Sequence, residues 1–359
     1  MNLIYSKRDA VICLAAGKSQ LPIIIKAKKL GYLIIAIDKN RLAPGFKYAD
    51  YKIYHSTYDS DKVINKIKKL NVKVIGILNK SSGPPVITTA KIAKNFKIPG
   101  VKVSVAKTFI NKDKMRNAFA KQGLPIPKYF IYKKHKYKTS NKHTLPFIVK
   151  PSLSLVGKKG VSVVKSKDKI FDAIKYAENN TINNKILIEE YIEGKDFSLI
   201  SFVNNFKLFP ICLLEELNIE SKNGKIIPMG YRTIKPQYNF LKPKIFDIAK
   251  KIIYNFEIKR SPLMISFRKN LKNELKIIEI HLDIGGDYLI EKFFPKALSY
   301  NFETIAIKMA LGEQKLQTNI SVKPTAIFYK DREVSDKSCK VLSARTDNNL
   351  EKKISKLKL

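Results

Sequence analysis

Apolar and polar residues alternate in blocks along the first forty or so positions, and the blocks have the lengths of strands and helices. The run Ala10–Ala16 is apolar throughout, as buried strands are, and Tyr32–Ile37 repeats that pattern. Between them, Leu21–Gly31 carries apolar residues at helical spacing and ends on glycine, a common residue after a helix. The order strand, helix, strand, with Asp38 closing the second strand, predicts a parallel βαβ unit.

The same alternation continues further along the chain. Val72–Leu78 has the pattern of a strand, Pro85–Phe96 that of a helix, and Asn111–Gly123 that of an amphipathic helix with Asn111 as its N-cap. We therefore expect an N-terminal α/β domain. The missing G-x-G-x-x-G motif weakens the case for a dinucleotide ligand. The turn Gly17–Ser19 offers N–H groups to an anion at a helix N-terminus, although a plain connecting turn explains it equally well.

Two apolar strands enclose a glycine-containing basic loop in the middle of the chain. The strand Pro146–Pro151 carries Lys150 near its end, the loop Gly157–Gly160 follows, and Ile186–Ser198 begins as a second strand and ends in acids. Glycine lets backbone N–H groups approach a phosphate and lysine adds positive charge, so this set suits a nucleoside triphosphate. The alternative is a strand pair with a solvated loop; the ordered set favours the nucleotide.

Acidic and imidazole side chains alternate with apolar ones on a later strand. In Leu275–Ile284, residues Glu279, His281 and Asp283 fall on one face because the side-chain period of a strand is two. Two acids and an imidazole on one face suggest a Mg²⁺ or Mn²⁺ site, although Mg²⁺ prefers oxygen ligands. An edge strand with a solvated polar face is the alternative. The adjoining glycine pair and the flanking apolar runs favour the metal site.

Between these regions, a hairpin and a helix are expected. Asn223-Gly224 is a hairpin signal, and Pro243–Phe256 has the apolar spacing of a helix. Arg232 and Lys235 follow the hairpin and are candidates for gripping a substrate carboxylate or a transferring phosphate, with a solvent-facing loop nearly as good an explanation. Phe293–Gly312 predicts a further helix.

Composition narrows the class of protein. Of the 359 residues, 45% are hydrophobic, which indicates a globular chain. The net charge of +39 is carried by lysines spread along the whole chain, which favours a solvated surface over a nucleic-acid partner. The three cysteines are far apart and fit a reducing compartment. Since no apolar run is long enough to span a bilayer, we expect a cytoplasmic protein without a membrane partner.

From Ala10 to Gly312 the chain resembles the ATP-grasp family of carboxylate–amine ligases and carboxylases, on the order and spacing of these motifs. The resemblance implies that Lys150 contacts the base and phosphates of ATP and that Asp196 holds the ribose. It also implies that Lys114 contacts phosphate. The remaining nucleotide-binding residues that it implies are the mobile phosphate loop with Gly157, Lys158 and Gly160, and the adenine hinge with Glu189, Glu190, Tyr191 and Ile192.

The chain also departs from the family pattern at the metal-binding end. The family has an acid at the position of Ser266, an asparagine at His281 and an arginine at Asp283, so that only Glu279 matches. Either the site is rebuilt, with His281 and Asp283 as ligands, or the protein binds nucleotide without turnover. Arg232 or Arg268 would have to replace the missing arginine.

The expected fold class is α/β, with an α+β nucleotide-binding half. We expect a Rossmann-like domain that precedes the ATP-grasp domain (residues 1–105), a two-lobed ATP-grasp domain (106–312, with a lid at about 145–196) and a short C-terminal segment (313–359). The resemblance implies an ADP-producing ligase that uses ATP and Mg²⁺ (or Mn²⁺) to join a carboxylate to an amine through an acyl phosphate. The alternative is a degenerate ATP-binding or sensing protein. Dimers are common among such ligases.

Overall fold

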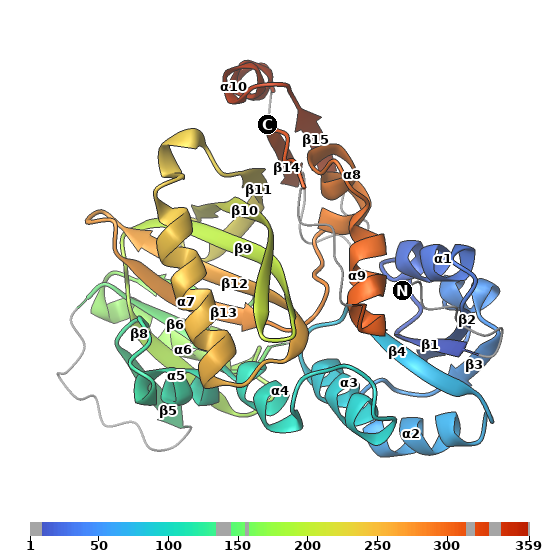
Figure 1. The fold of residues 1–359 in the computed structure, drawn as a ribbon. Coiled ribbons are helices and arrows are strands. Elements are labelled where there is room, and N and C mark those ends of the chain that lie inside the picture. The colour runs from blue at the N-terminus through green and yellow to red at the C-terminus, as the bar shows by residue number, and fades with distance from the viewer. Residues whose placement is uncertain (1–8, 134–144, 155–157, 314–319, 330–338, 358–359) are drawn as a thin grey trace.

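The computed structural model of the protein describes all residues except 1–8, 134–144, 155–157, 314–319, 330–338 and 358–359. Three sheets organise the described chain (Figure 1): a four-stranded sheet at the N-terminal end, a second four-stranded sheet in the middle of the sequence, and a seven-stranded sheet in the C-terminal half. Gly157 of the predicted phosphate loop lies outside the described residues.

The N-terminal sheet is parallel throughout and has the strand order β3-β2-β1-β4. The expected βαβ unit is confirmed, and its strands are buried because helices cover the sheet. Its strands are β1 (Asp9–Leu14), β2 (Leu33–Asp38), β3 (Tyr51–Tyr54) and β4 (Lys73–Asn79), and its helices are α1 (Leu21–Lys29), α2 (Ser60–Lys68) and α3 (Pro84–Asn95).

The middle sheet, which we call the lid sheet, is antiparallel with the order β5-β8-β6-β7 and buries its apolar face against one helix. Strand β5 precedes the segment 145–196 in which a lid was expected, so the lid sheet also draws on residues before that segment. Its elements are β5 (Tyr129–Lys133), β6 (Phe147–Pro151), β7 (Ser162–Val164), α6 (Ile170–Glu178) and β8 (Lys185–Glu190).

The central sheet has the order β13-β12-β9-β10-β11-β14-β15. One face packs against α4 (Val103–Phe109), α5 (Lys112–Lys121) and α7 (Leu241–Asn255), and alternate residues such as Phe197 and Leu199 point into that core. The opposite face looks toward the lid and the N-terminal domain. The strands are β9 (Gly194–Asn204), β10 (Lys207–Glu220), β11 (Ile226–Thr233), β12 (Arg260–Asn270), β13 (Leu275–His281), β14 (Thr325–Tyr329) and β15 (Cys339–Ser343).

The last helices join the domains. The segment predicted as one helix, Phe293–Gly312, is instead the end of a π-helical turn (Leu289–Phe293) followed by α8 (Phe294–Ala297) and α9 (Phe302–Leu311). Helix α9 lies against β4, where Gly76 permits the approach: a Cβ there would be 2.9 Å from the carbonyl oxygen of Ala310. One apolar core therefore runs from the N-terminal domain into the central sheet.

The C-terminal segment takes part in the fold. Strands β14 and β15 extend the central sheet, and α10 (Asp347–Ser355) packs against β15. Short 3₁₀ turns occupy Pro44–Tyr48, Lys167–Lys169 and Pro236–Tyr238.

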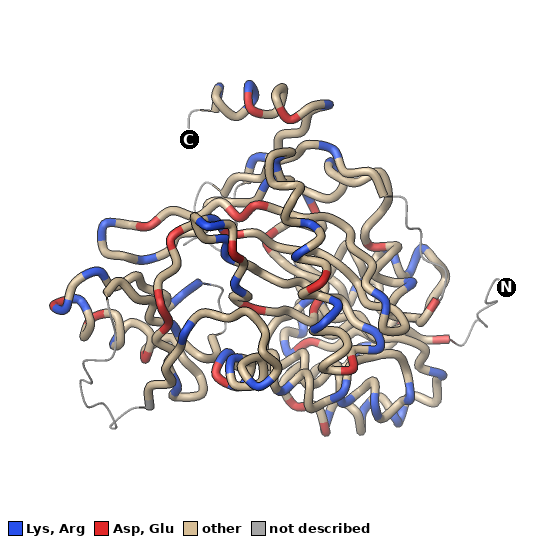
Figure 2. Tube along the Cα trace, turned by 60° about the vertical axis from the view of Figure 1, so that its left-hand side comes forward, with Lys and Arg blue, Asp and Glu red and all other residues tan. Residues whose placement is uncertain are grey.

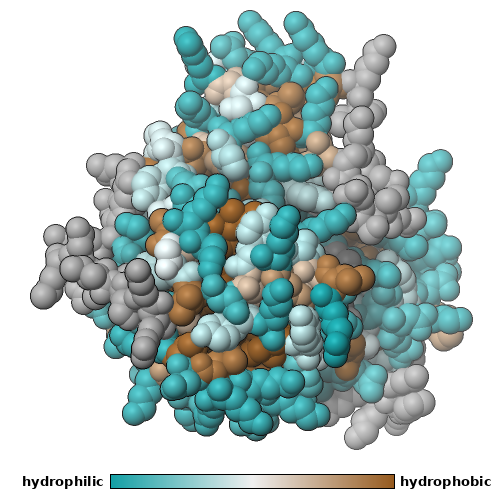
Figure 3. Space-filling view, turned by 90° about the vertical axis from the view of Figure 1, so that its right-hand side faces the viewer, coloured by the Kyte–Doolittle hydropathy of each residue, from teal (hydrophilic) through white to brown (hydrophobic). Residues whose placement is uncertain are grey.

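Basic residues follow the whole course of the chain and are not gathered on one element (Figure 2). On the face drawn in Figure 3, hydrophilic side chains cover much of the surface and apolar ones show between them in separate areas. No helix within the described part of the chain combines the length and the apolar character needed to cross a membrane.

Candidate functional site

Four polar residues line the side of the central sheet that faces the lid. We call the space on this side the cleft; part of it is the cavity lined by Lys112, Ser154 and Glu279. Ser198, Glu216, Ser266 and Glu279 come from β9, β10, β12 and β13, which are four of its strands. Glu216 accepts hydrogen bonds from both serine hydroxyls, and Ser266 pairs directly with Glu279 in the strand register. We call these four residues the sheet wall. They lie on the face opposite α7, because their neighbours in sequence point into the α7 core.

Three buried charged residues form a second group beside the cleft, which we call the lid cluster: Arg116, Lys150 and Glu189. Arg116 Nε and Nη2 donate to the two oxygens of Glu189 at 2.7 and 3.2 Å, and Lys150 Nζ lies 2.6 Å from Glu189 Oε2. Their side chains are 0, 6 and 3% exposed. Arg116 Nη2 also donates to the carbonyl of Ile278 at 2.8 Å, which ties the lid to β13.

Burial shapes the protonation of the lid cluster. It lowers the pKa of Lys150 to about 8, although Glu189 partly offsets the effect. Burial works against the charge of Glu189 as well, but Arg116 and Lys150 outweigh it and lower the pKa of that carboxyl. Lys150 is therefore mostly charged at neutral pH and loses its proton far more readily than an exposed lysine.

The described part of the phosphate loop is docked on the sheet wall. Lys158 Nζ lies 2.8 Å from Glu216 Oε2 and 2.7 Å from Asn218 Oδ1. Gly160 has φ +82°, and a Cβ at this position would lie 2.6 Å from Pro151 Cγ, so both the backbone and the space require glycine.

Glu279 is paired with two cations. Lys112 Nζ lies 3.1 Å from Glu279 Oε2, and His281 Nε2 lies 3.3 Å from Oε1. Burial opposes the charge of both His281 and Glu279. The carboxylates of Glu279 and Asp283 nevertheless raise the pKa of His281 to about 9, and the two cations hold the pKa of Glu279 well below its usual range. Without a metal ion, His281 therefore favours the imidazolium form, in which both ring nitrogens are donors.

Oxygen donors at this end suit a hard divalent cation better than the imidazole does. Glu216 and Glu279 provide carboxylates, and Asp283 Oδ2 is buried without a hydrogen-bond partner among the described residues. No three His, Cys, Asp or Glu residues in the described ranges are grouped so that they would hold a metal by themselves. The metal role of Glu279, His281 and Asp283 stays a prediction, with His281 its weakest member.

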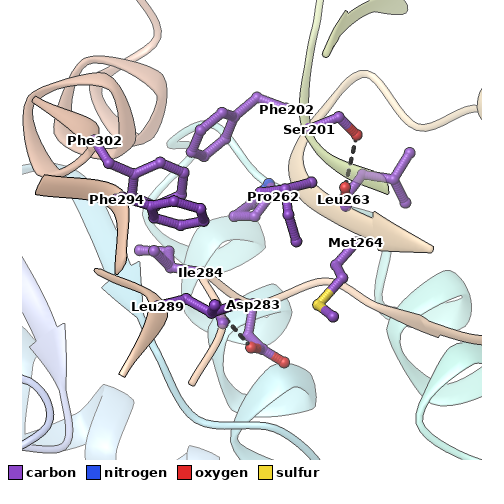
Figure 4. A pocket seen from close by; sticks show the side chains of 12 residues that line it. Ser201, Phe202, Pro262, Leu263, Met264, Asp283, Ile284, Leu289, Phe294 and Phe302 are labelled. Atoms are coloured by element: carbon purple, nitrogen blue, oxygen red, sulfur yellow. Dashed lines mark hydrogen bonds between the residues drawn. The ribbon is translucent and has the colours of Figure 1, made fainter. Parts of the chain in front are cut away.

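Asp283 lies at the edge of an apolar pocket (Figure 4). Phe294 and Phe302 stack there with ring centroids 4.5 Å apart, and the Asp283 carboxylate accepts from the backbone N–H of Gly285 at 2.9 Å. Asp283 also lines the neighbouring cavity that contains Lys112 and Glu279.

Arg268 lies at the other end of the cleft, beside the predicted ribose acid. Its guanidinium binds both oxygens of Asp196 at 2.7 Å and donates to the carbonyl of Ile192 at 3.2 Å. It also lies 6.0 Å from the ring centre of Tyr191. The structure therefore brings Asp196, Tyr191, Ile192 and Arg268 together. Their nucleotide-binding and catalytic roles stay predictions, as does that of Glu190, whose carboxylate accepts from the backbone N–H of Lys128.

Arg232 and Lys235 are not in the cleft, contrary to the expectation that they grip a reacting group. Arg232 pairs in register with Glu215, which points into the α7 side of the sheet. Its guanidinium bonds to Asp347 and Glu351 of α10, and Lys235 also pairs with Glu351. These contacts correct the predicted position of both side chains.

Lys114 is exposed on α5, and its contact with phosphate stays a prediction. Two residues along a helix turn the side chain by roughly 200°, so Lys112 points in another direction, where it pairs with Glu279 and lines the cavity beside it. Sequence reasoning did not single out Lys112, although it shares a helix face with the buried Met115 and Phe119.

Sequence reasoning also missed Glu216, Arg116 and Lys80. Glu215 and Glu216 are adjacent on β10, so one of the two had to face the cleft side, and that alternation was the available signal. Lys80 is buried between the N-terminal domain and the π-helical turn, where it donates to the carbonyl of Ser19 and pairs with Glu291. The anion role of the Gly17–Ser19 turn stays a prediction.

Comparisons with known proteins agree with this geometry. Residues 110–231 match the family model of the ATP-grasp (A) domain of phosphoribosylglycinamide synthetase. Formate-dependent phosphoribosylglycinamide formyltransferase of Methanocaldococcus jannaschii is 29% identical over 268 residues, a match that covers 67% of this chain and 61% of that protein. The chain thus spans about three fifths of the length of this curated relative.

Solved structures share the fold over nearly the whole chain. N5-carboxyaminoimidazole synthetase from Staphylococcus aureus, complexed with ADP, superposes with a TM-score of 0.78 at 16% identity and covers 99% of this chain and 98% of its own. Phosphoribosylglycinamide synthetase from Anaerococcus prevotii gives a TM-score of 0.71 at 19% identity, with 97% of both chains covered.

A parallel α/β domain, an antiparallel lid sheet and a central antiparallel sheet make up the fold that the chain shares with these solved structures. Residues 110–231 therefore match an ATP-grasp domain, and the chain as a whole shares its fold with the solved structures above. The comparisons give no support to the degenerate alternative.

Proposed function

We propose that the protein is an ATP-dependent ligase that joins a carboxylate to an amine through an acyl phosphate and releases ADP and phosphate. The observation that carries the proposal is the cleft with cations on the lid side and carboxylates on the sheet side. Lys150 and Lys158 would neutralise the phosphates of ATP, while Glu279 would hold Mg²⁺ against them.

The reaction proceeds by two transfers. A carboxylate oxygen of the substrate attacks the γ-phosphorus of ATP, the bond to the β–γ bridging oxygen breaks, and ADP leaves. The amine nitrogen then attacks the acyl carbon, loses a proton, and phosphate departs with the electron pair of its C–O bond. Mg²⁺, when bound, screens the charge of the triphosphate.

The residues of the chain would mainly position and neutralise the reactants. Lys112 and His281 place two positive charges beside Glu279 at the cavity that also contains Ser82 and Gly83 of the N-terminal domain. A carboxylate or acyl phosphate in this cavity would be stabilised by those cations. The phosphate loop would close over the nucleotide and keep water from the acyl phosphate.

The names of the relatives suggest the first substrates to test. Formate with phosphoribosylglycinamide follows from the curated relative, and amino acids follow from the name of another protein of this fold, the L-amino acid ligase from Bacillus licheniformis, which has a TM-score of 0.74 at 16% identity. Phosphoribosylated amines and amino acids are therefore the substrate classes that we infer.

A hydroxylamine trap tests the proposal without knowledge of the amine. Hydroxylamine converts an acyl phosphate to a hydroxamate, so the correct carboxylate should give hydroxamate and ADP in equal amounts. A panel of formate, glycine and other amino acids is incubated with MgATP and hydroxylamine. Nucleotide binding without any carboxylate-dependent ADP release across a broad panel would contradict the ligase assignment.

A further inference from the structure

Glu216 is a buried carboxylate that faces the cleft from a strand on which no metal ligand was expected. Its side chain is 6% exposed, and every described contact of its two oxygens points into the cleft: Ser198 and Ser266 donate to Oε1, and Lys158 pairs with Oε2. Its neighbour Glu215 is equally buried but points to the other side, where it pairs with Lys195 at 2.9 Å.

Between Glu216 and Glu279 the sheet carries Ser266, where no carboxylate is available to a metal. Ser266 stands directly opposite Glu279 in the strand register and offers only a hydroxyl. Glu216 Oε1 lies 2.9 Å from that hydroxyl, so its carboxylate reaches the space above Ser266 from the strand on the far side of β9. Two carboxylates thus flank Ser266.

The two carboxylates feel each other electrostatically. Glu216 is 6% exposed and its Oε2 lies 2.8 Å from Lys158 Nζ, so that lysine balances its negative charge against the nearby carboxylate of Glu279. Glu216 is therefore an anion that depends on a neighbouring cation. In the free protein that cation is Lys158 of the phosphate loop.

A bound nucleotide would change this pairing. Its phosphates are the stronger anion and would attract Lys158, which leaves Glu216 buried and without its counter-charge. A divalent cation that bridges carboxylates and phosphates would restore neutrality, and one or two carboxylates are what a Mg²⁺-nucleotide complex takes from a protein. Glu216 and Glu279 are oxygen donors of the required kind.

We propose that Glu216 is a metal-facing carboxylate of the nucleotide site, which with Glu279 holds the divalent cation of the bound nucleotide in place of an acid at Ser266. The inference rests on the proposed function, since it concerns the nucleotide of the same site. It gives the site two carboxylates from β10 and β13, in place of the set Glu279, His281 and Asp283 that spacing along one strand predicted.

Calorimetry of ADP binding with and without Mg²⁺ tests the inference on the full-length protein. In the unaltered protein Mg²⁺ should strengthen binding roughly tenfold or more. Glu216→Gln should remove most of that gain while leaving the Mg²⁺-free affinity equal or higher, because Lys158 is released for the phosphates. Glu215→Gln is the matched control and should keep the full gain.

A rescue variant separates a ligand from a merely structural carboxylate. Placing Ser266→Asp in the Glu216→Gln background returns an acid to the same space, and the Mg²⁺ gain should return with it. Mn²⁺ provides a second readout by electron paramagnetic resonance: in the presence of ADP, Glu216→Gln should leave more Mn²⁺ free than Glu215→Gln does. Circular dichroism establishes that all variants fold.

The results distinguish this inference from the proposed function. A Mg²⁺ gain in Glu216→Gln as large as in Glu215→Gln, or a gain absent from the unaltered protein, would overturn the role of Glu216 and leave nucleotide binding intact. Equal loss in both single variants would also overturn it. ADP that fails to bind the unaltered protein with or without Mg²⁺ would overturn the proposed function itself, and this inference with it.

Discussion

The lid cluster keeps its charges in one buried group, whereas each carboxylate of the sheet wall is paired with a partly exposed lysine. Arg116 and Lys150 hold Glu189 from two sides, and all three side chains are nearly inaccessible. On the sheet wall, Glu216 is paired with Lys158 of the phosphate loop and Glu279 with Lys112 of α5, and both lysines are partly exposed.

The difference indicates which side of the cleft is rigid and which side changes on binding. A buried pair is costly to break, because the remaining charge has no water to replace its partner. A partly exposed pair is weaker and can be exchanged for another anion or cation. We therefore expect the lid cluster to hold the structure together and the sheet wall to exchange partners when nucleotide and metal arrive.

The largest effect expected from this comparison is on stability. Arg116→Met removes two hydrogen bonds to Glu189 and one to Ile278, and should destabilise the protein by about 3–5 kcal/mol. Lys112→Met is the matching change at the sheet wall, where Glu279 keeps His281, and should cost less than about 1 kcal/mol. Chemical denaturation measures both, and equal losses would contradict the division between a rigid and an exchangeable side.

A smaller effect is expected on nucleotide affinity when the lid cluster loses its lysine. Lys150→Met should weaken ADP binding by roughly 10- to 150-fold, the range for losing a hydrogen bond to a charged group of about 1.5–3 kcal/mol. Lys185→Met is the control, since Lys185 lies on the same face of β8 as Glu189 but pairs with Asp113 at 2.6 Å. Calorimetry on folded variants decides the matter. Affinity unchanged in Lys150→Met, or reduced equally in both, would show that Lys150 is structural.

Deprotonation of Lys150 should also weaken ADP binding, by less than the substitution does. Burial lowers its pKa to about 8, so the charged form dominates at pH 7 and only about a tenth of it remains at pH 9. Because a phosphate prefers the charged form, ADP affinity should be nearly constant below pH 7 and fall about tenfold between pH 7 and pH 9. Arginine stays charged throughout, so Lys150→Arg should bind with a flat profile over this range. A fall of the same size in Lys150→Arg would assign the titration to another group.

Much of the fold could be predicted from the sequence. Apolar periodicity predicted β1, α1, β2, α3 and α5, and the ordered motifs predicted the lid strands, because these signals are local. The break between α8 and α9 was missed, since a π-helical turn and the apolar contacts that follow it leave no local mark on the spacing.

The charged residues of the site were harder to predict from the sequence, because periodicity within a helix or strand does not reveal which neighbouring element each of its faces contacts. Lys150, Asp196 and Glu279 were predicted, and each is paired with an opposite charge in the structure, while their roles stay predictions. Glu216 and Arg116 were missed because most of their partners lie 50 or more residues away in the chain. The sequence could not show which side of the sheet Arg232 faces for the same reason: only the register of β10 and β11 shows that it shares a side with Glu215.

The smallest change in ADP affinity is expected for Arg232→Met, and this variant tests which face of the central sheet binds the nucleotide. Arg232→Met removes the bonds to Asp347 and Glu351, so it should lower the melting temperature by loosening α10 from the sheet. Its side chain points away from the sheet wall, so ADP affinity should stay within about twofold, below the effect of a single lost hydrogen bond. Calorimetry and thermal unfolding measure the two quantities independently. If ADP affinity instead fell as far as in Lys150→Met, the charge of Arg232 would have to act across the central sheet, and the assignment of the cleft to the face of Ser198, Glu216, Ser266 and Glu279 would be wrong.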